Sequence, residues 1–533
     1  MNYRTMSVIT FGPPATSSPP ETHVLAAEGG TLASIEEWIN EVFTPISDGL
    51  SNFVFAELTI GSISFPWIVA WLILAAAIFT CYFGFIQFRR FKLATELVRG
   101  KYTNPDEPGE INHFQALASA LSGTVGLGNI AGVGVAVTIG GAGATFWMIV
   151  AGLLAMCTKF VECTLGVKYR EVHEDGTVSG GPMHYLRKGL ADRFRNGFGI
   201  GLGKVLAVLA AIMLLFFAFA GGNMFQANQT FAQLRDVTGG DDGFLASDGA
   251  AFVFGVVLAI VVGAVIIGGI KSIGAVTSRL VPAMAIIYIS ACLIVIGVNI
   301  SDVPSAFGEI ISGAFTGEGV AGGAIGALIV GFQRSAFSNE AGLGSAPIAH
   351  SAVKTKNPIT EGYVALLEPF IDTVIVCTMT ALTVVIANTQ FWNDAKATVA
   401  AGGETPDGVT VTSESFETVL PWFPYVLTIA VVLFALSTII TWGYYGQKAW
   451  AFLFGKSRTA ERVYQAIFCL LTIAGCVLTL GSVLSFADAV LFLLALFNII
   501  GLYLLVPVVK REVADFAGKL RSGEVKKIEK VRS

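Results

Sequence analysis

Charged residues are scarce in this sequence of 533 residues. Asp, Glu, Lys and Arg together make up 13% of the chain, whereas apolar residues make up 54%. A soluble chain carries roughly 25% charged residues, so these few charges cannot coat the several water-soluble domains that this length would otherwise form. The same figures exclude a disordered chain, a coiled coil and a secreted disulfide scaffold. The composition therefore predicts a protein that crosses a membrane several times.

The sequence also lacks a basic excess, a paired cysteine motif and a signal peptide. The formal net charge of −5 gives nucleic-acid binding no electrostatic basis. All seven cysteines lie inside apolar runs without a CxxC motif, which predicts buried small side chains. The polar residues 1–30 have no basic start or apolar core and are predicted to form a disordered tail. Residues 32–57 are predicted to lie on the membrane surface as an amphipathic segment.

Long apolar runs, in contrast, are abundant. A helix needs about 20 apolar residues to cross a bilayer. The predicted spans are the eleven runs 66–88, 114–140, 144–168, 204–230, 251–269, 275–300, 321–350, 361–388, 421–450, 463–483 and 486–509. Because these runs are apolar on every side and do not alternate, they predict helices rather than the strands of a membrane barrel.

The distribution of basic residues supports this division independently. Of the 33 Lys and Arg residues, 28 fall in alternate connecting segments and the C-terminal tail, 3 fall in the other segments and 2 fall within spans. Because cytoplasmic loops carry the excess of Lys and Arg, we expect the N-terminus outside the cell and the C-terminus in the cytosol. The predicted parts are an extracytoplasmic tail with the amphipathic segment at 1–57, an extra helix and cytosolic loop at 58–112, two five-helix repeats at 113–300 and 301–509, and a basic cytosolic tail at 510–533.

Two predicted spans are interrupted at mid-membrane depth. Residues 122–129 contain three glycines, each of which weakens a helix by about 1 kcal/mol relative to Ala. Residues 333–347 contain Arg334, Asn339 and Glu340 as well as glycine and proline. Unwound backbone survives at this depth only where it lines a cavity or is buried in protein. Close packing of helices through small residues is the alternative explanation for the glycines, but it does not account for the polar side chains.

The positions of the two interruptions divide the chain symmetrically. Without the first span, each interrupted helix opens a set of five spans, and five is odd, so the two sets form an inverted repeat. Paired discontinuous helices mark the substrate site in transporters built this way. The N-terminus of a half-helix attracts a carboxylate, while exposed carbonyl groups suit Na⁺. The pair therefore suits a zwitterionic amino acid together with a sodium ion.

Hydroxyl groups for such an ion are present on the eighth span of this ten-helix core. Ser437 and Thr438 lie at mid-depth, and Thr441 follows one turn later. These side chains either bind the ion or bond to carbonyl groups of their own helix.

Four sequence runs carry a resemblance to a known family. They are 121–133 (LSGTVGLGNIAGV), 221–228 (GGNMFQAN), 337–347 (FSNEAGLGSAP) and 441–443 (TWG). In this order they resemble the alanine or glycine:cation symporters, over about residues 60–510, and 125–129 also resembles the broken first helix of the leucine-transporter fold. The resemblance implies an all-α membrane protein of eleven transmembrane helices, with an inverted 5+5 repeat, one extra N-terminal helix and two discontinuous helices. It implies Na⁺-coupled uptake of alanine or glycine by alternating access, with Na⁺ as a co-transported ion and not a cofactor, and no enzymatic activity.

The resemblance also assigns the residues of the site. The expected substrate-binding residues are Thr124, Gly126, Leu127, Gly128, Asn129, Gln226, Phe337, Ser338 and Trp442. The expected sodium-binding residues are Ser122, Val125, Ser437 and Thr438. Within these sets the glycine run and Asn129 hold the substrate carboxylate. Gln226 contacts substrate or bonds to a neighbouring helix, and Phe337 and Trp442 wall a small apolar pocket or pack in the core.

Several other charged residues inside the spans are given structural roles. Lys159 and Glu162 are three residues apart on one helix, and we expect a local pair whose ends reach the cytosolic surface. His113 and His350 are expected at the membrane interface. Asp488, near the mouth of the last span, is expected to start a helix.

Glu368 and Asp372 share a helix face, which suits either a coupling or gating role or a packing network. Together with the two histidines, they keep open the alternative function, a proton-coupled amino-acid carrier of the same fold. An ion channel would need a continuous polar pore, usually around a symmetry axis, and an enzyme would need a nucleophile–base pair or a metal motif such as HExxH. Neither pattern is present. We therefore expect a multi-pass, monomeric protein of the bacterial inner membrane, whose partners are the lipid bilayer and small neutral amino acids and not nucleic acid.

Overall fold

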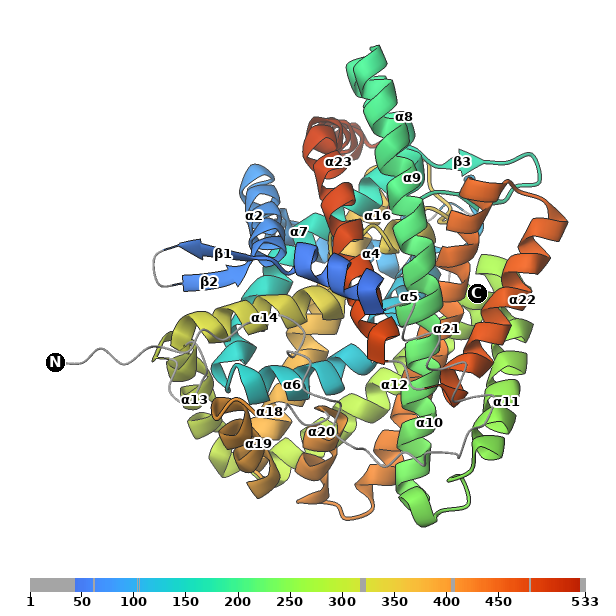
Figure 1. Cartoon of the computed structure of the whole chain (residues 1–533). Helices are drawn as coiled ribbons and strands as arrows, with labels where there is room; N and C mark the ends of the chain where they lie inside the picture. The colour runs from blue at the N-terminus through green and yellow to red at the C-terminus, as the bar shows by residue number, and fades with distance from the viewer. Residues whose placement is uncertain are drawn as a thin grey trace, which may run out of the picture.

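The computed structural model describes residues 44–60, 63–102, 104, 106–316, 323–403, 408–478 and 481–527, which form a bundle of helices (Figure 1). The predicted tail at 1–30 lies outside the described residues, as do residues 32–43 of the predicted amphipathic segment 32–57. Of the described part of that segment, 44–57, residues 44–54 are helical and bury Ser47, Ser51 and Val54, which share one side of the helix.

The elements follow the apolar runs of the sequence. Two short antiparallel hairpins pair β1 (Glu57–Ile60) with β2 (Ile63–Pro66) and β3 (Glu171–Val172) with β4 (Val178–Ser179). The helices up to residue 302 are α2 (Trp67–Tyr82), α3 (Ile86–Arg89), α4 (Phe91–Val98), α5 (His113–Thr124), η1 (Leu127–Asn129), α6 (Ala131–Ile139), α7 (Gly143–Lys168), α8 (Pro182–Phe194), α9 (Gly197–Phe219), η2 (Ala220–Met224), α10 (Phe225–Val237), η3 (Gly240–Asp242), α11 (Asp248–Ile266), α12 (Gly269–Val298) and η4 (Ile300–Asp302). Those that follow are α13 (Val303–Thr316), α14 (Gly323–Asn339), α15 (Ala346–His350), α16 (Pro358–Ala365), α17 (Leu367–Pro369), η5 (Phe370–Cys377), α18 (Thr378–Ala387), α19 (Gln390–Ala400), α20 (Gly408–Glu417), α21 (Phe423–Phe454), α22 (Arg458–Val477) and α23 (Gly481–Ser522).

Eight helical spans in the described residues are long and apolar enough to cross a membrane, and α5 with η1 and α6 form a ninth when the broken pair is counted as one span. The helix α2 is shorter, at 16 residues, and α14 is separated from α15 by the second interruption. The predicted class, a helical membrane protein, is confirmed. The count of eleven crossings and the inverted repeat stay predictions.

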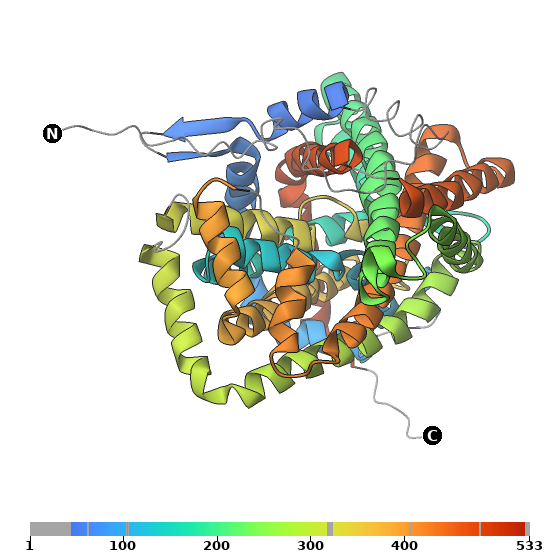
Figure 2. The ribbon, with the colours of Figure 1, turned by 60° about the horizontal axis from the view of Figure 1, so that its bottom comes forward.

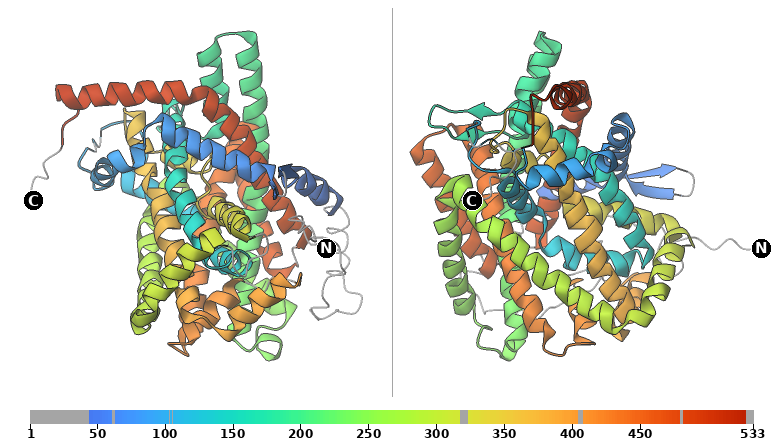
Figure 3. Two further views of the ribbon diagram at one scale, coloured as in Figure 1. Left: turned by 90° about the vertical axis from the view of Figure 1, so that its left-hand side faces the viewer. Right: turned by 180° about the vertical axis from the view of Figure 1, so that it is seen from behind.

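The long elements α9, η2 and α10 run as one column along the bundle, and the β1–β2 hairpin projects from its side (Figure 2). In contrast, α23 bends, so that its C-terminal end lies across one end of the bundle (Figure 3). Pro507 lies inside α23, and proline kinks a helix because it removes a hydrogen bond and clashes with the preceding turn. Lys527, beyond the helix, lies 2.9 Å from Glu96 of α4.

One end of the bundle carries α8, the β3–β4 hairpin and the C-terminal end of α23. This end is called the basic face below.

Five of the seven cysteines are buried, as predicted, but Cys81 is exposed and Cys469 is half-buried. The prediction fails for these two because a helix at the edge of a membrane bundle turns one apolar side outward, so an apolar run does not by itself place a residue in the core.

A buried carboxylate joins the basic-face halves of the two interrupted helices. Glu361 of α16 contacts the Nδ1 atom of His113, the first residue of α5, through one oxygen. Its other oxygen lies 2.5 Å from the Nδ1 atom of His350, the last residue of α15. The exposed fractions of the three side chains are 0%, 2% and 0% for Glu361, His113 and His350. Both histidines are therefore buried in the protein, because a buried carboxylate supplies a partner that each ring would otherwise find in water. Their predicted depth, at the membrane interface, stays a prediction.

The same network continues into the bundle through Lys159 of α7. Its ammonium lies 2.8 Å from Glu368 of α17 and 3.7 Å from Glu162. Glu368 in turn lies 3.6 Å from the Nε2 atom of His350. The predicted local pair of Lys159 and Glu162 is present, but its predicted reach to the cytosolic surface is wrong, because both side chains are fully buried and the nearer partner of Lys159 comes from another helix. The network fixes α5 and α15 against α7 and α16, and so sets where both interruptions lie.

We expect Glu361→Ala to destabilise the protein by about 3 kcal/mol or more, because it leaves two buried imidazole rings without their common partner. Thermal unfolding of the purified protein in detergent measures this effect. Glu309→Ala on α13, where the glutamate is exposed, is the matched control and should leave the midpoint unchanged. Equal midpoints for both variants would show that the network does not hold the helices.

Candidate functional site

The first interruption separates two half-helices that meet at an angle of 66° between α5 and η1–α6. Asn129 closes the gap, because its Oδ1 atom accepts a hydrogen bond of 2.9 Å from the N–H of Gly126. A Cβ atom on Gly126 would lie 3.1 Å from the Oγ1 atom of Thr438. The unwound backbone therefore lies directly against α21, where a larger residue would crowd the hydroxyl group.

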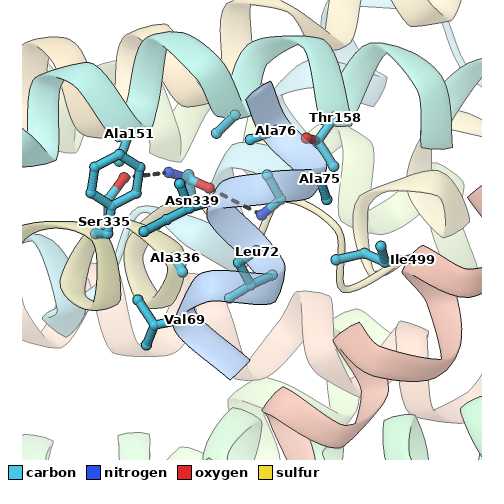
Figure 4. Close-up of a pocket in the computed structure, with 14 residues that line it drawn as sticks. Val69, Leu72, Ala75, Ala76, Ala151, Thr158, Ser335, Ala336, Asn339 and Ile499 are labelled. Atoms are coloured by element: carbon cyan, nitrogen blue, oxygen red, sulfur yellow. Dashed lines mark hydrogen bonds between the residues drawn. The ribbon is translucent and has the colours of Figure 1, made fainter. Parts of the chain in front are cut away.

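The second interruption follows α14 and turns through left-handed backbone at Glu340, Gly342 and Gly344, with φ of 53°, 89° and 81°. Glycine adopts this conformation without steric cost. Figure 4 shows Asn339 at the end of α14, where it accepts a 3.0 Å bond from the N–H of Ala341 and donates a 3.0 Å bond to Ser335. The pocket drawn there has a volume of about 30 Å³. It has room for one or two water molecules, so it is too small for an amino acid.

Side chains from two other helices complete the second interruption. One oxygen of Glu162 accepts bonds from the N–H of Gly344, at 3.1 Å, and from Asn498 of α23, at 3.2 Å. Asn498 also donates to the carbonyl group of Gly342, at 2.8 Å. Glu162 is thus used to satisfy unwound backbone.

Asp372, in the π-helical turn η5, ties the two interruptions together. Its oxygens accept bonds from Asn129, at 2.7 Å, from Ser338, at 2.5 Å, and from Thr373, at 2.9 Å. Asn129 also donates to the Ser338 hydroxyl group, at 2.9 Å. Asp372 and Glu368, predicted on one helix face, therefore bond to different partners. Asp372 faces the interruptions, and Glu368 faces Lys159.

A cavity of about 490 Å³ lies where the interruptions meet the α9–α10 column, α21 and α23. This volume falls in the range of ligand pockets, about 300–1,000 Å³. The predicted site residues that line it are Thr124, Gly126, Leu127, Gly128, Gln226, Phe337, Trp442 and Thr438. Asn129 and Ser338 are 0% and 1% exposed and are bonded to Asp372 behind the cavity wall. Their predicted contact with substrate stays a prediction.

Trp442 is an almost fully buried aromatic wall of the cavity, with 1% of its surface exposed. Its ring centroid lies 4.5 Å from that of Phe217 and 5.3 Å from that of Tyr445, in edge-to-face contacts. Its indole N–H donates to the carbonyl group of Gly123, at 3.4 Å. Trp442 therefore forms a rigid wall that is fixed to the first interruption.

Gln226 lines this cavity and carries a side-chain oxygen that is not used within the described chain. Its Nε2 atom donates to the carbonyl group of Gly221, at 3.3 Å. Its Oε1 atom is buried and has no hydrogen-bond partner within the described chain. A buried acceptor of this kind costs free energy unless a ligand supplies the donor, and the adjacent cavity is where such a ligand would lie.

The predicted sodium-binding hydroxyl groups come together between α5 and α21. The Ser122 hydroxyl donates to the Ser437 carbonyl, at 2.8 Å, and the Thr438 hydroxyl lies 3.2 Å from the Ser122 carbonyl oxygen. Thr441 donates to the Ser122 hydroxyl, at 3.0 Å. Val125 follows the end of α5 at the interruption itself. The group gathers neutral hydroxyl and carbonyl oxygens from two helices, and such oxygens suit a small monovalent cation.

Three charged side chains also line the cavity: Arg334, Glu340 and Asp488. The first two stand out in the sequence as polar residues within an interrupted span. The prediction that Asp488 starts a helix is wrong, because α23 begins at Gly481, about two turns earlier.

The π-helical turns η2 and η5 were not predicted from the sequence. For η2 the signal in the sequence is the glycine pair that precedes Asn223, but η5 has no comparable one.

Comparison with known proteins gives consistent matches across the chain. Residues 51–530 match the Sodium:alanine symporter family. The sodium/alanine symporter AgcS of Methanococcus maripaludis is 40% identical over 85% of this chain and 95% of its own length. The amino-acid carrier protein AlsT of Bacillus subtilis is 34% identical over 84% of this chain and 88% of its own, and the probable sodium/glutamine symporter GlnT of the same organism is 30% identical over 84% and 87%.

Among solved structures, the transporter MhsT in complex with L-phenylalanine aligns with a TM-score of 0.51 at 15% identity, over 73% of this chain and 88% of MhsT. This likeness confirms the leucine-transporter fold and, at that identity, nothing about the substrate. The relatives are named as transporters and not as enzymes, and with the apolar helices they confirm a multi-pass membrane transporter. The predicted family resemblance is confirmed: the chain belongs to the sodium:alanine symporter family.

Proposed function

We propose that the protein moves small neutral amino acids, alanine or glycine above all, into the cell together with Na⁺. The observation that carries the proposal is the contact between the oxygen group and the cavity. Thr438 belongs to both, and Gly126 of the first interruption lies against it. An ion held by these oxygens and a substrate in the cavity would be neighbours, so each would favour binding of the other.

The cavity supplies suitable groups for each part of a zwitterion. The unwound backbone at Gly126, Leu127 and Gly128 precedes α6, where a half-helix N-terminus attracts a carboxylate. The free Oε1 atom of Gln226 accepts a bond from the ammonium group. Phe337 and Trp442 then limit the size of the side chain. Asn129 and Ser338 act by holding the interruption in shape through Asp372.

The proposed ion site also explains how binding becomes movement. Ser122 lies on α5, which the buried network fixes to α7, α15 and α16, whereas Thr438 lies on α21. An ion bound between them stabilises the arrangement in which these parts are close. Alternating access then follows if the two parts, built from the proposed eleven spans with an inverted 5+5 repeat, rock against each other around the site.

A proton-coupled carrier of the same fold is the second candidate. Glu368 and both histidines are held in the buried network, so this alternative now rests on Asp372. Its oxygens accept bonds from Asn129, Ser338 and Thr373, all of which are neutral. A proton-coupled carrier needs a buried carboxylate that can take up and release a proton, and Asp372 lies between the two interruptions.

We expect the purified protein in liposomes to accumulate labelled alanine under an inward Na⁺ gradient and not under an equal K⁺ gradient at matched pH. The reason is that only the bound Na⁺ completes the oxygen group. Accumulation with both cations that a protonophore abolishes would favour the proton-coupled alternative. No accumulation with either, from protein shown to be folded, would contradict the proposed substrates.

We expect Thr438→Ala to weaken the apparent affinity for Na⁺ by about tenfold, because it removes one of the few oxygens that would contact the ion. Thr438→Ser keeps the hydroxyl group and should restore most of the affinity. Thr428→Ala removes the same group from α21 outside the site and is the control. The concentration of Na⁺ that gives half-maximal uptake is the measurement, and an unchanged value for Thr438→Ala would exclude this ion site.

We expect Gln226→Leu to raise the KM for alanine by about tenfold, since the substrate ammonium loses its acceptor. Gln233→Leu is the matched control, because Gln233 lies two turns further along α10 and bonds to Thr428. Uptake as a function of alanine concentration at saturating Na⁺ checks this expectation. Equal KM values in the two variants would place the ammonium elsewhere.

A further inference from the structure

A second polar cavity, of about 190 Å³, lies at the basic face, apart from the site described above. Its lining residues come from the β3–β4 hairpin, α8, the C-terminal end of α21 and Lys456 just beyond it. Figure 1 shows α8 and β3 at the same end of the bundle. A single water molecule needs roughly 10–15 Å³ of such space, so this cavity has room for a group of several atoms. Nothing in the proposed transport cycle uses it.

Positive charge dominates the lining of this cavity. Its four cationic side chains are Arg187, Lys188, Lys448 and Lys456, and its two imidazole rings are His173 and His184. The single carboxylate among the lining residues is Glu171, which lies 2.8 Å from Lys188. The cavity therefore holds a surplus of positive charge that its own lining does not neutralise.

The partners of each cation show which charges remain available. Lys456 pairs with Asp175 at 3.4 Å, outside the cavity lining. Lys448 donates to the Val178 carbonyl at 2.7 Å, and in the described residues no carboxylate lies within ion-pair distance of it. Arg187 is exposed and has no hydrogen bond or ion pair in the described part of the chain. Two cations from two different helices thus have no carboxylate partner in the described part of the chain.

The titration of the neighbouring groups agrees with this surplus. Burial, together with the ammonium groups of Lys456 and Lys448, lowers the pKa of the His173 ring. His184 and then Lys188 hold the pKa of Glu171 well below its usual range. The first shift favours the neutral His173 ring, and the second favours the ionised Glu171 carboxylate. Nearby positive charge acts in the same direction on both groups.

We propose that this cavity binds a phosphate group, either free inorganic phosphate or the phosphate of an anionic phospholipid. Four cations from α8, α21 and the segment just after α21 converge there. A carboxylate ligand carries only one negative charge and would not need so many. Arginine beside lysine is the combination that recognises phosphate oxygens. Basic pockets among transmembrane helices on the cytoplasmic side also bind anionic lipid head groups, and the distribution of basic loops predicts that this face is cytoplasmic. The proposal holds whether or not the transported substrate is alanine.

Lys448 of α21 and Lys456, just beyond the end of α21, also fasten the hairpin, since Lys448 donates to the Val178 carbonyl and Lys456 donates to Thr177, each at 2.7 Å. A substitution at Lys448 or Lys456 could therefore disturb folding. Arg187 has no such bonds, so Arg187→Gln removes charge from the cavity and leaves the fold intact. Arg193→Gln is the matched control, because it removes an exposed charge from the same helix outside the cavity.

The test measures thermal unfolding of the purified full chain as inorganic phosphate replaces chloride at constant ionic strength and Na⁺. A second arm compares protein in phosphatidylcholine bilayers with protein in phosphatidylcholine mixed with phosphatidylglycerol. Ligand that binds the folded state raises the unfolding temperature. We expect stabilisation of the parent protein and of Arg193→Gln, and an apparent affinity at least roughly tenfold weaker in Arg187→Gln.

Stabilisation by inorganic phosphate that depends on Arg187 would identify free phosphate as the ligand. Stabilisation that depends on Arg187 in the phosphatidylglycerol bilayer alone would identify the lipid. The proposal is overturned if neither arm stabilises the parent protein, if Arg187→Gln keeps the full effect, or if Arg193→Gln loses as much as Arg187→Gln.

Discussion

The structure depends on one constraint: unwound backbone in the middle of a membrane must find hydrogen-bond partners within the protein. Each interruption meets this need with an asparagine that bonds to nearby backbone N–H groups, Asn129 in the first and Asn339 in the second. Glu162 and Asn498 supply further partners to the second. The backbone groups around the cavity are therefore held in place before any ligand binds, which is the preorganisation that selective binding needs.

Buried charge follows from the same constraint. A carboxylate inside the bundle is tolerated only with partners, and the structure provides them from separate helices. Glu361 holds one histidine from each interrupted helix, and Lys159 holds Glu368. Because these contacts join α5, α7, α15, α16 and α17, they favour movement of this group of helices as one body. The oxygen group between α5 and α21 then lies on the boundary where the proposed movement would take place.

The family and the helical class could be predicted from the sequence, as could part of the cavity lining. Apolar runs and the placement of Lys and Arg define the helices because lipid contact requires a long apolar stretch and leaves charges at its ends. The interruptions were predicted because glycine and charged residues at mid-membrane depth conflict with an ordinary span. Eight of the predicted site residues line the cavity because they lie on or opposite those interruptions.

The sequence by itself thus determined the fold class and the family, whereas only the tertiary structure decided the partners of the buried polar groups. Lys159 is three residues from Glu162, yet its nearer partner is Glu368, more than 200 residues away. Asn129 belongs to the glycine run, yet Asp372 engages its side chain behind the cavity wall. Spacing along a helix defines which residues share a face. Which helix packs against that face is set by the whole bundle, and for a buried polar group that choice decides its role.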